Sequence, residues 1–231
     1  EALLAELDDG WLGDQARGLR TYAGVLAGER LSYADEVEGC YGVRPVLGDE
    51  AGAIAVVHER LERLGFAVER VAIDPEAALA DPHGGYPALS YEGRTNVAGR
   101  LRGSGGRSSL NLSGHVDVVP TAGQQWTHPP FDAELVDGVI WGRGALDMKS
   151  GVASALIACR EAAKLGLAGD VVVAAVADEE HASLGVQEAL RAVQADAAIV
   201  TEPTELEVVV AHKGFVWTEV EVTGRAAHGS R

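Results

Sequence analysis

The chain has 231 residues and carries 35 acidic against 19 basic side chains, which gives a formal net charge of −16. This balance excludes a broad nucleic-acid or anionic-lipid surface, because both need clustered cations. Hydrophobic residues make up 47% of the chain, yet no apolar run approaches the roughly 18 residues of a membrane span. The first residues are acidic, so no secretory signal is visible. Two cysteines, Cys40 and Cys159, are too few for a disulfide scaffold and indicate a reducing cytoplasm.

The acids concentrate in two segments. Residues 1–50 carry 11 acids and 4 bases, and residues 171–210 carry 8 acids and 1 base. The first segment is typical of a solvated face. In the second segment several acids follow directly on apolar runs, where a bound cation would offset the cost of crowding them.

Residues 49–73 predict a helix followed by a strand. Apolar residues recur at helical spacing from Ile54 to Leu64, with Asp49 as the N-cap and Gly65 just past the end. The strand is expected at 66–73, and the Pro- and Gly-rich residues 74–94 are expected to form a loop. Further strands are predicted at 95–101 and 109–113, and a hairpin at 134–141 around Asp137-Gly138.

The next part of the chain alternates helices with strands. A helix is predicted over 148–165, with Gly166 as its stop, and the continuous apolar run 171–177 predicts a strand covered on both faces. A helix at 183–193 and a buried strand at 197–200 follow. This alternation is typical of an α/β sheet with helices on both sides. Two more strands are predicted at 207–211 and 215–223.

Side chains capable of metal chemistry follow directly on these predicted strands. They are His115, Asp178, Glu179, Glu180 and Glu202. Ligands of such sheets gather at the carboxyl ends of the strands. A mixed set of imidazole and carboxylate groups predicts a divalent transition metal, with zinc as the first choice. A free carboxylate beside the metal would then act as a general base on water.

Single motifs in this set also have simpler interpretations. In His115-x-Asp117 the Asp can fix the tautomer of the His, but an isolated pair of this kind is more often a hydrogen-bonded core His. Asp147 precedes a predicted helix and could be a plain N-cap. Glu179-Glu180 is harder to explain without a cation, because adjacent carboxylates at the end of a strand repel each other.

Four motifs, in order and spacing, resemble those of the M20 metallopeptidase and deacylase family. They are Ser113-Gly-His-Val-Asp-Val-Val-Pro120, Gly142-Arg-Gly-Ala-Leu-Asp-Met-Lys-Ser-Gly151, Asp178-Glu-Glu180 and Thr201-Glu-Pro-Thr204. The family includes acetylornithine deacetylase, succinyl-diaminopimelate desuccinylase, aminoacylase and glutamate-releasing carboxypeptidases. The resemblance runs from about residue 50 to the end of the sequence. It implies a three-layer α/β catalytic domain of the zinc-peptidase type, with a mixed, mostly parallel sheet.

The resemblance also implies a site with two divalent metal ions, most simply zinc, with cobalt and manganese as alternatives. His115 and Glu202 would hold one ion, Glu180 the other, and Asp147 would bridge them. Asp117 would orient His115, and Glu179 would be the general base that deprotonates the attacking water. The family commonly has a cis peptide bond after the bridging Asp, here Asp147-Met148.

The implied domain organisation has three parts. Residues 1–48 have no assigned role, residues 49–212 form the catalytic domain, and residues 213–231 begin an α+β lid and dimerisation domain. In the family a His of the lid, here His228, reaches the active site of the partner subunit and stabilises the oxyanion. A homodimer is therefore expected when the lid is complete.

One ligand of the family has no counterpart here. The second zinc of the family takes a further His from near the C-terminus of a longer chain, and none of the seven His residues follows the lid segment. Either the sequence is a piece of a longer chain, or the enzyme is incomplete. The expected activity is removal of an acyl group from a small N-acyl amino acid or related amine. The alternatives are a dipeptidase or carboxypeptidase of the same family, and an inactive metal-binding fragment or interaction module.

Overall fold

The computed structural model describes residues 48–81, 85, 87, 89–211, 213, 214, 221, 223 and 224. Residues 1–47, His228 and most of the strand predicted at 215–223 lie outside this part. The described elements are, in chain order, α4 (Ala51–Arg63), β1 (Ala67–Ala72), α5 (Pro75–Ala80), β2 (Thr95–Leu101), β3 (Leu110–His115), β4 (Glu134–Val136), β5 (Val139–Trp141), the irregular turn η1 (Ala145–Lys149), α6 (Ser150–Leu165), β6 (Val171–Val176), α7 (Leu184–Ala192) and β7 (Ala197–Val200).

Five strands form one mixed sheet in the order β1-β2-β6-β3-β7. β2 pairs antiparallel with both β1 and β6, whereas β3 pairs parallel with both β6 and β7. Four strands therefore run in one direction and β2 runs in the other, which confirms the expected mixed, mostly parallel sheet. The predicted hairpin is also present as β4 and β5, with positive φ at Asp137 and Gly138.

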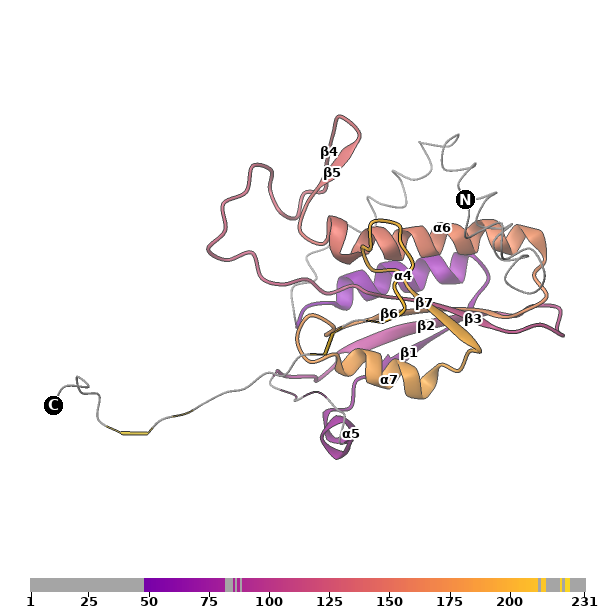
Figure 1. Cartoon of the computed structure of the whole chain (residues 1–231), viewed down its shortest axis with the longest axis horizontal. Coiled ribbons are helices and arrows are strands. Elements are labelled where there is room, and N and C mark those ends of the chain that lie inside the picture. Colours follow the sequence, from indigo (N-terminus) through magenta and orange to yellow (C-terminus); the bar gives the residue numbers. More distant parts are fainter. Residues whose placement is uncertain are drawn as a thin grey trace.

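The sheet lies between two helix layers (Figure 1). Helices α4 and α6 cover one face, and α7 covers the other. The central strand β6 shows both packings, because Val171, Val173 and Ala175 join the cluster under α4 and α6. The alternate residues Ala174 and Val176 pack with Ala189 of α7. β6 is buried along its whole length, as its continuous apolar run predicts. No helix among the described residues combines the length and the apolar character needed to cross a membrane.

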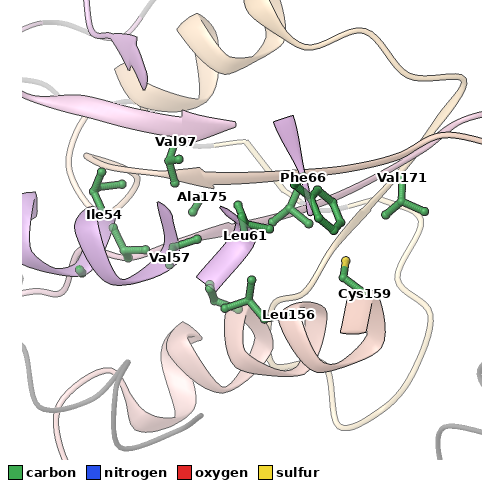
Figure 2. Packing of buried hydrophobic residues seen from close by; sticks show 13 residues of the cluster. Ile54, Val57, Leu61, Phe66, Val97, Leu156, Cys159, Val171 and Ala175 are labelled. Carbon is green, nitrogen blue, oxygen red and sulfur yellow. The ribbon is translucent and has the colours of Figure 1, made fainter. Parts of the chain in front are cut away.

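The main hydrophobic cluster lies between the sheet and the helix pair α4 and α6 (Figure 2). Ile54, Val57 and Leu61 recur at helical spacing on the face of α4 that meets the sheet. Leu156 and Cys159 approach the same cluster from α6. This core holds the sheet rigid behind the strand ends that carry the predicted site.

Two features near the start of the described chain differ from the sequence-based expectations. The helix α5 lies in the predicted loop: the Asp74 carboxylate accepts the amides of Glu76 and Ala77 at 2.9 and 3.2 Å, and Pro75 opens the helix. The expectation of a loop was wrong for these residues, because a helix this short shows no hydrophobic periodicity. Residues 89–94 have no helix or strand, as expected. The N-cap of α4 is Glu50, not Asp49, and its side chain makes no capping bond.

The last strand also differs from its prediction. β7 was expected to be buried, but Ile199 and Val200 are 43% and 60% exposed. Within the described residues β7 pairs only with β3 and forms an edge of the sheet. Residues 207–211, predicted as a strand, are described and have no strand conformation.

Candidate metal centre

Three parallel strands end at one edge of the sheet and bring the predicted ligands together. His115 is the last residue of β3 and pairs in register with Val176, the last residue of β6. The chain continues from β6 into Asp178-Glu179-Glu180 and from β7 into Glu202. Because these strands point the same way, residues far apart in sequence share one edge, as expected for ligands of an α/β sheet.

A further contributor, Asp147, comes from the irregular turn η1 in front of α6. The Asp147-Met148 peptide bond in this turn is cis, which confirms the expectation from the motif. Glycines let the turn and helix approach the strand ends closely. A Cβ at Gly114 would lie 2.8 Å from Met148 Cε, and a Cβ at Gly151 would lie 1.9 Å from the carbonyl oxygen of Thr201. A side chain at Gly151 would displace the backbone of Thr201, the residue before Glu202, whereas one at Gly114 would require the ends of the Met148 and Val152 side chains to shift.

The carboxylates surround the Nε2 atom of His115. Asp147 Oδ1 lies 3.0 Å from Nε2, and Glu179 Oε2 and Glu202 Oε1 each lie 3.7 Å from it. Two groups of donor atoms are each close enough to share an ion: His115 with Glu179 and Glu202, and His115 with Asp147 and Glu180. The structure thus brings all four predicted ligands and the predicted base to one place. His115 is 2% exposed, whereas the carboxylates face solvent in part.

His115 is oriented by the backbone of Asp117. The carbonyl oxygen of Asp117 lies 3.0 Å from Nδ1 and can only accept, so Nδ1 carries a proton and Nε2 is the ring nitrogen that faces the carboxylates. The carboxylate of Asp117, expected to orient the ring, lies 3.6 Å from Nδ1. It accepts the amides of Glu179 and Glu180 at 3.2 and 3.1 Å. Asp117 therefore contacts both the imidazole and the backbone of the paired carboxylates.

The electrostatics of the cluster follow from burial and crowding. Burial raises the pKa of Glu202 to about 7, and the charges of Asp147, Glu179 and Glu180 add to the rise. Burial also raises the pKa of Asp117 to about 6. Burial lowers the pKa of His115, but the nearby charges of Asp117, Glu179 and Glu202 outweigh it and raise that pKa.

This arrangement fits a divalent metal. The donors are one imidazole nitrogen and several carboxylate oxygens, the mixed set that suits zinc, cobalt or manganese. Burial raises the pKa of Glu180 and of Glu202, and repulsion from the neighbouring carboxylates adds to the rise. A dication among them would offset that repulsion.

The structure adds residues that the sequence motifs did not single out. Tyr91 and Arg94 precede β2, and Glu50 precedes α4, yet their side chains meet around Asp178. They lie in segments without a motif, 87 and 44 residues away from their partners, and no local pattern marks them.

Comparisons with known proteins agree with this geometry. The family model described as peptidase family M20/M25/M40 matches residues 111–229, just over half of the chain. Among curated proteins, succinyl-diaminopimelate desuccinylase of Parvibaculum lavamentivorans is 33% identical over 86% of this chain and 49% of its own length. Acetylornithine deacetylase of Proteus mirabilis is 34% identical over 74% of this chain and 40% of its own length. The chain thus spans about half the length of the curated relatives it matches, or less.

Solved structures show the same fold. Human carnosine dipeptidase 1 has a TM-score of 0.56 at 19% identity, covering 75% of this chain and 37% of that one. An M20 family metallo-carboxypeptidase of Sulfolobus solfataricus has a TM-score of 0.54 at 20% identity, covering 73% and 36%. The family model, the curated relatives and the arrangement of His115, Asp147, Glu180 and Glu202 agree, and the chain belongs to peptidase family M20/M25/M40.

Proposed function

We propose that this chain carries the metal centre of a zinc-dependent amidohydrolase that removes an acyl group from a small N-acyl amino acid or related amine. The observation that carries the proposal is the convergence of Asp147, Glu179 and Glu202 on His115 Nε2, with Glu180 in reach. Two curated relatives above 30% identity are named a desuccinylase and a deacetylase. They favour deacylase activity over peptidase activity for this chain.

The ligands are assigned by residue. His115, Asp147 and Glu202 would hold one ion, and Asp147 and Glu180 the second. When bound, two dications would polarise the amide carbonyl and lower the pKa of the attacking water. The paired motif residues Glu179 and Glu180 thus take different roles, one free to exchange protons and the other committed to the metal.

Glu179 handles the proton in this scheme. Its carboxylate lies at the cluster and is 39% exposed, so water and substrate can reach it. It takes a proton from water as the water oxygen bonds to the amide carbon, and returns that proton to the nitrogen as the C–N bond breaks. The amide of Glu179 is held by Asp117, which limits how far the base can drift.

Two substitutions in the full-length protein test the assignment. Glu179→Ala should keep its metal and lose turnover by at least about a hundredfold, because only the proton transfer is removed. Glu180→Ala should lose metal, measured by elemental analysis of the purified protein. Turnover in Glu179→Ala equal to that of the wild type would contradict the base role, and full metal content in Glu180→Ala would contradict the ligand role.

The substrate class is decided by a parallel assay. N-acetyl, N-succinyl and N-formyl amino acids are compared with dipeptides at equal concentration. A deacylase turns over the first group at higher kcat/KM. Preference for dipeptides would establish the peptidase alternative instead, and turnover of neither by metal-loaded protein would favour a non-catalytic metal-binding module.

Assembly and location are part of the same proposal. We expect a homodimer through the lid, with His228 acting in the partner's site, and light scattering of the full-length protein measures the mass. A cytoplasmic location is supported by the paucity of cysteines and by the buried, free thiol of Cys159.

A further inference from the structure

A buried polar cluster lies directly behind the paired carboxylates. It consists of Glu50, Tyr91, Arg94 and Asp178, and is called the Asp178 cluster below. Their exposed fractions are 2%, 6%, 8% and 0%. Three of the four carry formal charges, and charges are buried in proteins only when they are paired or serve a purpose that outweighs the cost.

Asp178 is held from three sides. Tyr91 Oη donates to Asp178 Oδ2 at 3.0 Å, and the amide of Leu184 donates to the same oxygen at 3.3 Å. Arg94 Nη2 forms an ion pair with Asp178 Oδ1 at 3.1 Å. Burial and the charge of Asp178 raise the pKa of Tyr91 above its usual range, so its hydroxyl remains a donor.

Arg94 is itself fixed by a second carboxylate. Its Nε donates to Glu50 Oε2 at 3.0 Å, its Nη2 donates to Glu50 Oε1, and its guanidinium lies over the Tyr91 ring at 4.7 Å. Arg94 thus connects the start of α4 with the end of β6. Its Nη1 is buried and has no hydrogen-bond partner in the described part of the chain.

The backbone at Asp178 explains what the cluster holds in place. Asp178 has φ of +69°, a left-handed conformation that is uncommon for residues other than glycine. This conformation turns the chain from the end of β6 into Glu179 and Glu180. The next two amides are bound by the Asp117 carboxylate. Three consecutive residues are therefore fixed, the first through its side chain and the other two through their N–H groups.

We infer that Tyr91 and Arg94 are positioning residues for the Glu179–Glu180 pair. By holding the carboxylate of Asp178 they keep the left-handed turn, and the turn places two mutually repelling carboxylates beside His115. Neither residue contacts the donor atoms themselves. The inference rests on the proposed metal site, and it adds residues outside the four family motifs to the machinery.

The test uses Tyr91→Phe, which removes one oxygen atom, and Arg94→Met with Arg94→Lys as its conservative partner, all in the full-length protein. Cobalt(II) is the probe, titrated into metal-free protein and followed by its visible absorption. The Tm of each metal-free variant and the kcat and KM of each zinc-loaded variant are measured in parallel. The matched control is Val171→Ala, a buried position at the start of the same strand, roughly 17 Å before its end at about 3.3 Å per residue.

For Tyr91→Phe we expect cobalt affinity and kcat each to fall about tenfold, with KM within twofold of the wild type. Arg94→Met should lose more cobalt affinity and more kcat than Tyr91→Phe, and Arg94→Lys should keep part of what Arg94→Met loses. Val171→Ala should lower Tm at least as much as Tyr91→Phe and leave cobalt affinity and kcat within twofold.

Two outcomes would overturn the inference. If Tyr91→Phe binds cobalt and turns over like Val171→Ala, the cluster only stabilises the fold, while the proposed function stands. If wild-type protein binds no cobalt, the proposed function fails and the inference fails with it. Should Arg94→Met not fold, Tyr91→Phe decides alone.

Discussion

The apolar core and the carboxyl edge of the sheet are built from the same strands but stabilised in opposite ways. β6 begins among the hydrophobic residues under α4 and α6 and ends at Val176, two residues before Asp178. β3 likewise ends in His115. In the core, neighbours remove apolar surface from water, and this burial stabilises the fold. At the edge, burial and then the neighbouring carboxylates raise the pKa of Glu202 and of Glu180, so their ionised forms are a cost to the metal-free fold.

The difference shows why the core has to be rigid. Carboxylates that repel each other stay together only if the backbone that carries them cannot relax. The core beneath the sheet, the Asp117 carboxylate and the Asp178 cluster supply that rigidity. The following predictions set the two regions against each other, starting with the largest expected effect.

Leu61→Ala should lower the free energy of unfolding by about 2–5 kcal/mol, because Leu61 is fully buried and its removal leaves a cavity. Metal affinity should not change, since Leu61 lies in the core under α4. Denaturant unfolding of the metal-free protein measures the first quantity, and cobalt titration the second. A large loss of cobalt affinity would show that the core and the edge are not separable in this way.

Metal affinity should fall as the pH is lowered below about 7. The pKa of Glu202 is raised to about 7, so below that pH the metal must displace a proton from this carboxylate. Each displaced proton lowers the affinity about tenfold per pH unit, which is about 1.4 kcal/mol, and His115, whose pKa is also raised, adds to the slope. Competition with a chelating dye between pH 5.5 and 8 measures this slope. A flat profile over that range would remove Glu202 from the set of ligands.

Glu202→Gln should stabilise the metal-free protein at pH 8 by on the order of 1 kcal/mol, a value reduced by the solvent that screens this side chain, which is 33% exposed. A carboxyl whose pKa is raised in the folded state stabilises the fold at low pH and loses that contribution as the pH rises through about 7. The difference between variant and wild type should therefore vanish near pH 4.5. Denaturant curves at both pH values test this, and a less stable variant at pH 8 would reverse the sign of the argument.

Arg63→Ala should change the free energy of unfolding by less than about 0.5 kcal/mol. Arg63 forms an ion pair with Glu59 on the exposed face of α4, and both side chains are in solvent. The variant provides the baseline for a residue outside both regions. An effect as large as that of Leu61→Ala would mean that this helix is held by its surface charges and not by its buried face.

Much of the fold was predictable because its signals are local. Ile54, Val57 and Leu61 recur at helical spacing, and the short, Val-rich apolar run of β6 favours a strand buried on both faces. The helix α5 and the true N-cap of α4 were missed. The first is too short to show a period, and the second depends on Glu50 turning away from the helix to pair with Arg94.

The positions of the candidate metal ligands were also largely predictable from the sequence. The positions of His115, Glu180 and Glu202 after strands indicated a shared edge, and the family motif added Asp147 with its cis peptide bond. The roles of Glu179 as base and of His228 remain predictions, and His228 lies outside the described residues.

What the sequence determined alone is the alternation of helices and strands and the kinds of side chain that end each strand, because both depend on neighbours along the chain. Only the tertiary structure decided that the backbone carbonyl oxygen of Asp117 contacts His115, and that its two carboxylate oxygens accept the amides of Glu179 and Glu180. It alone brought Tyr91 and Arg94 to Asp178. Contacts between residues so far apart depend on strand order and packing, and no periodicity in the sequence records them.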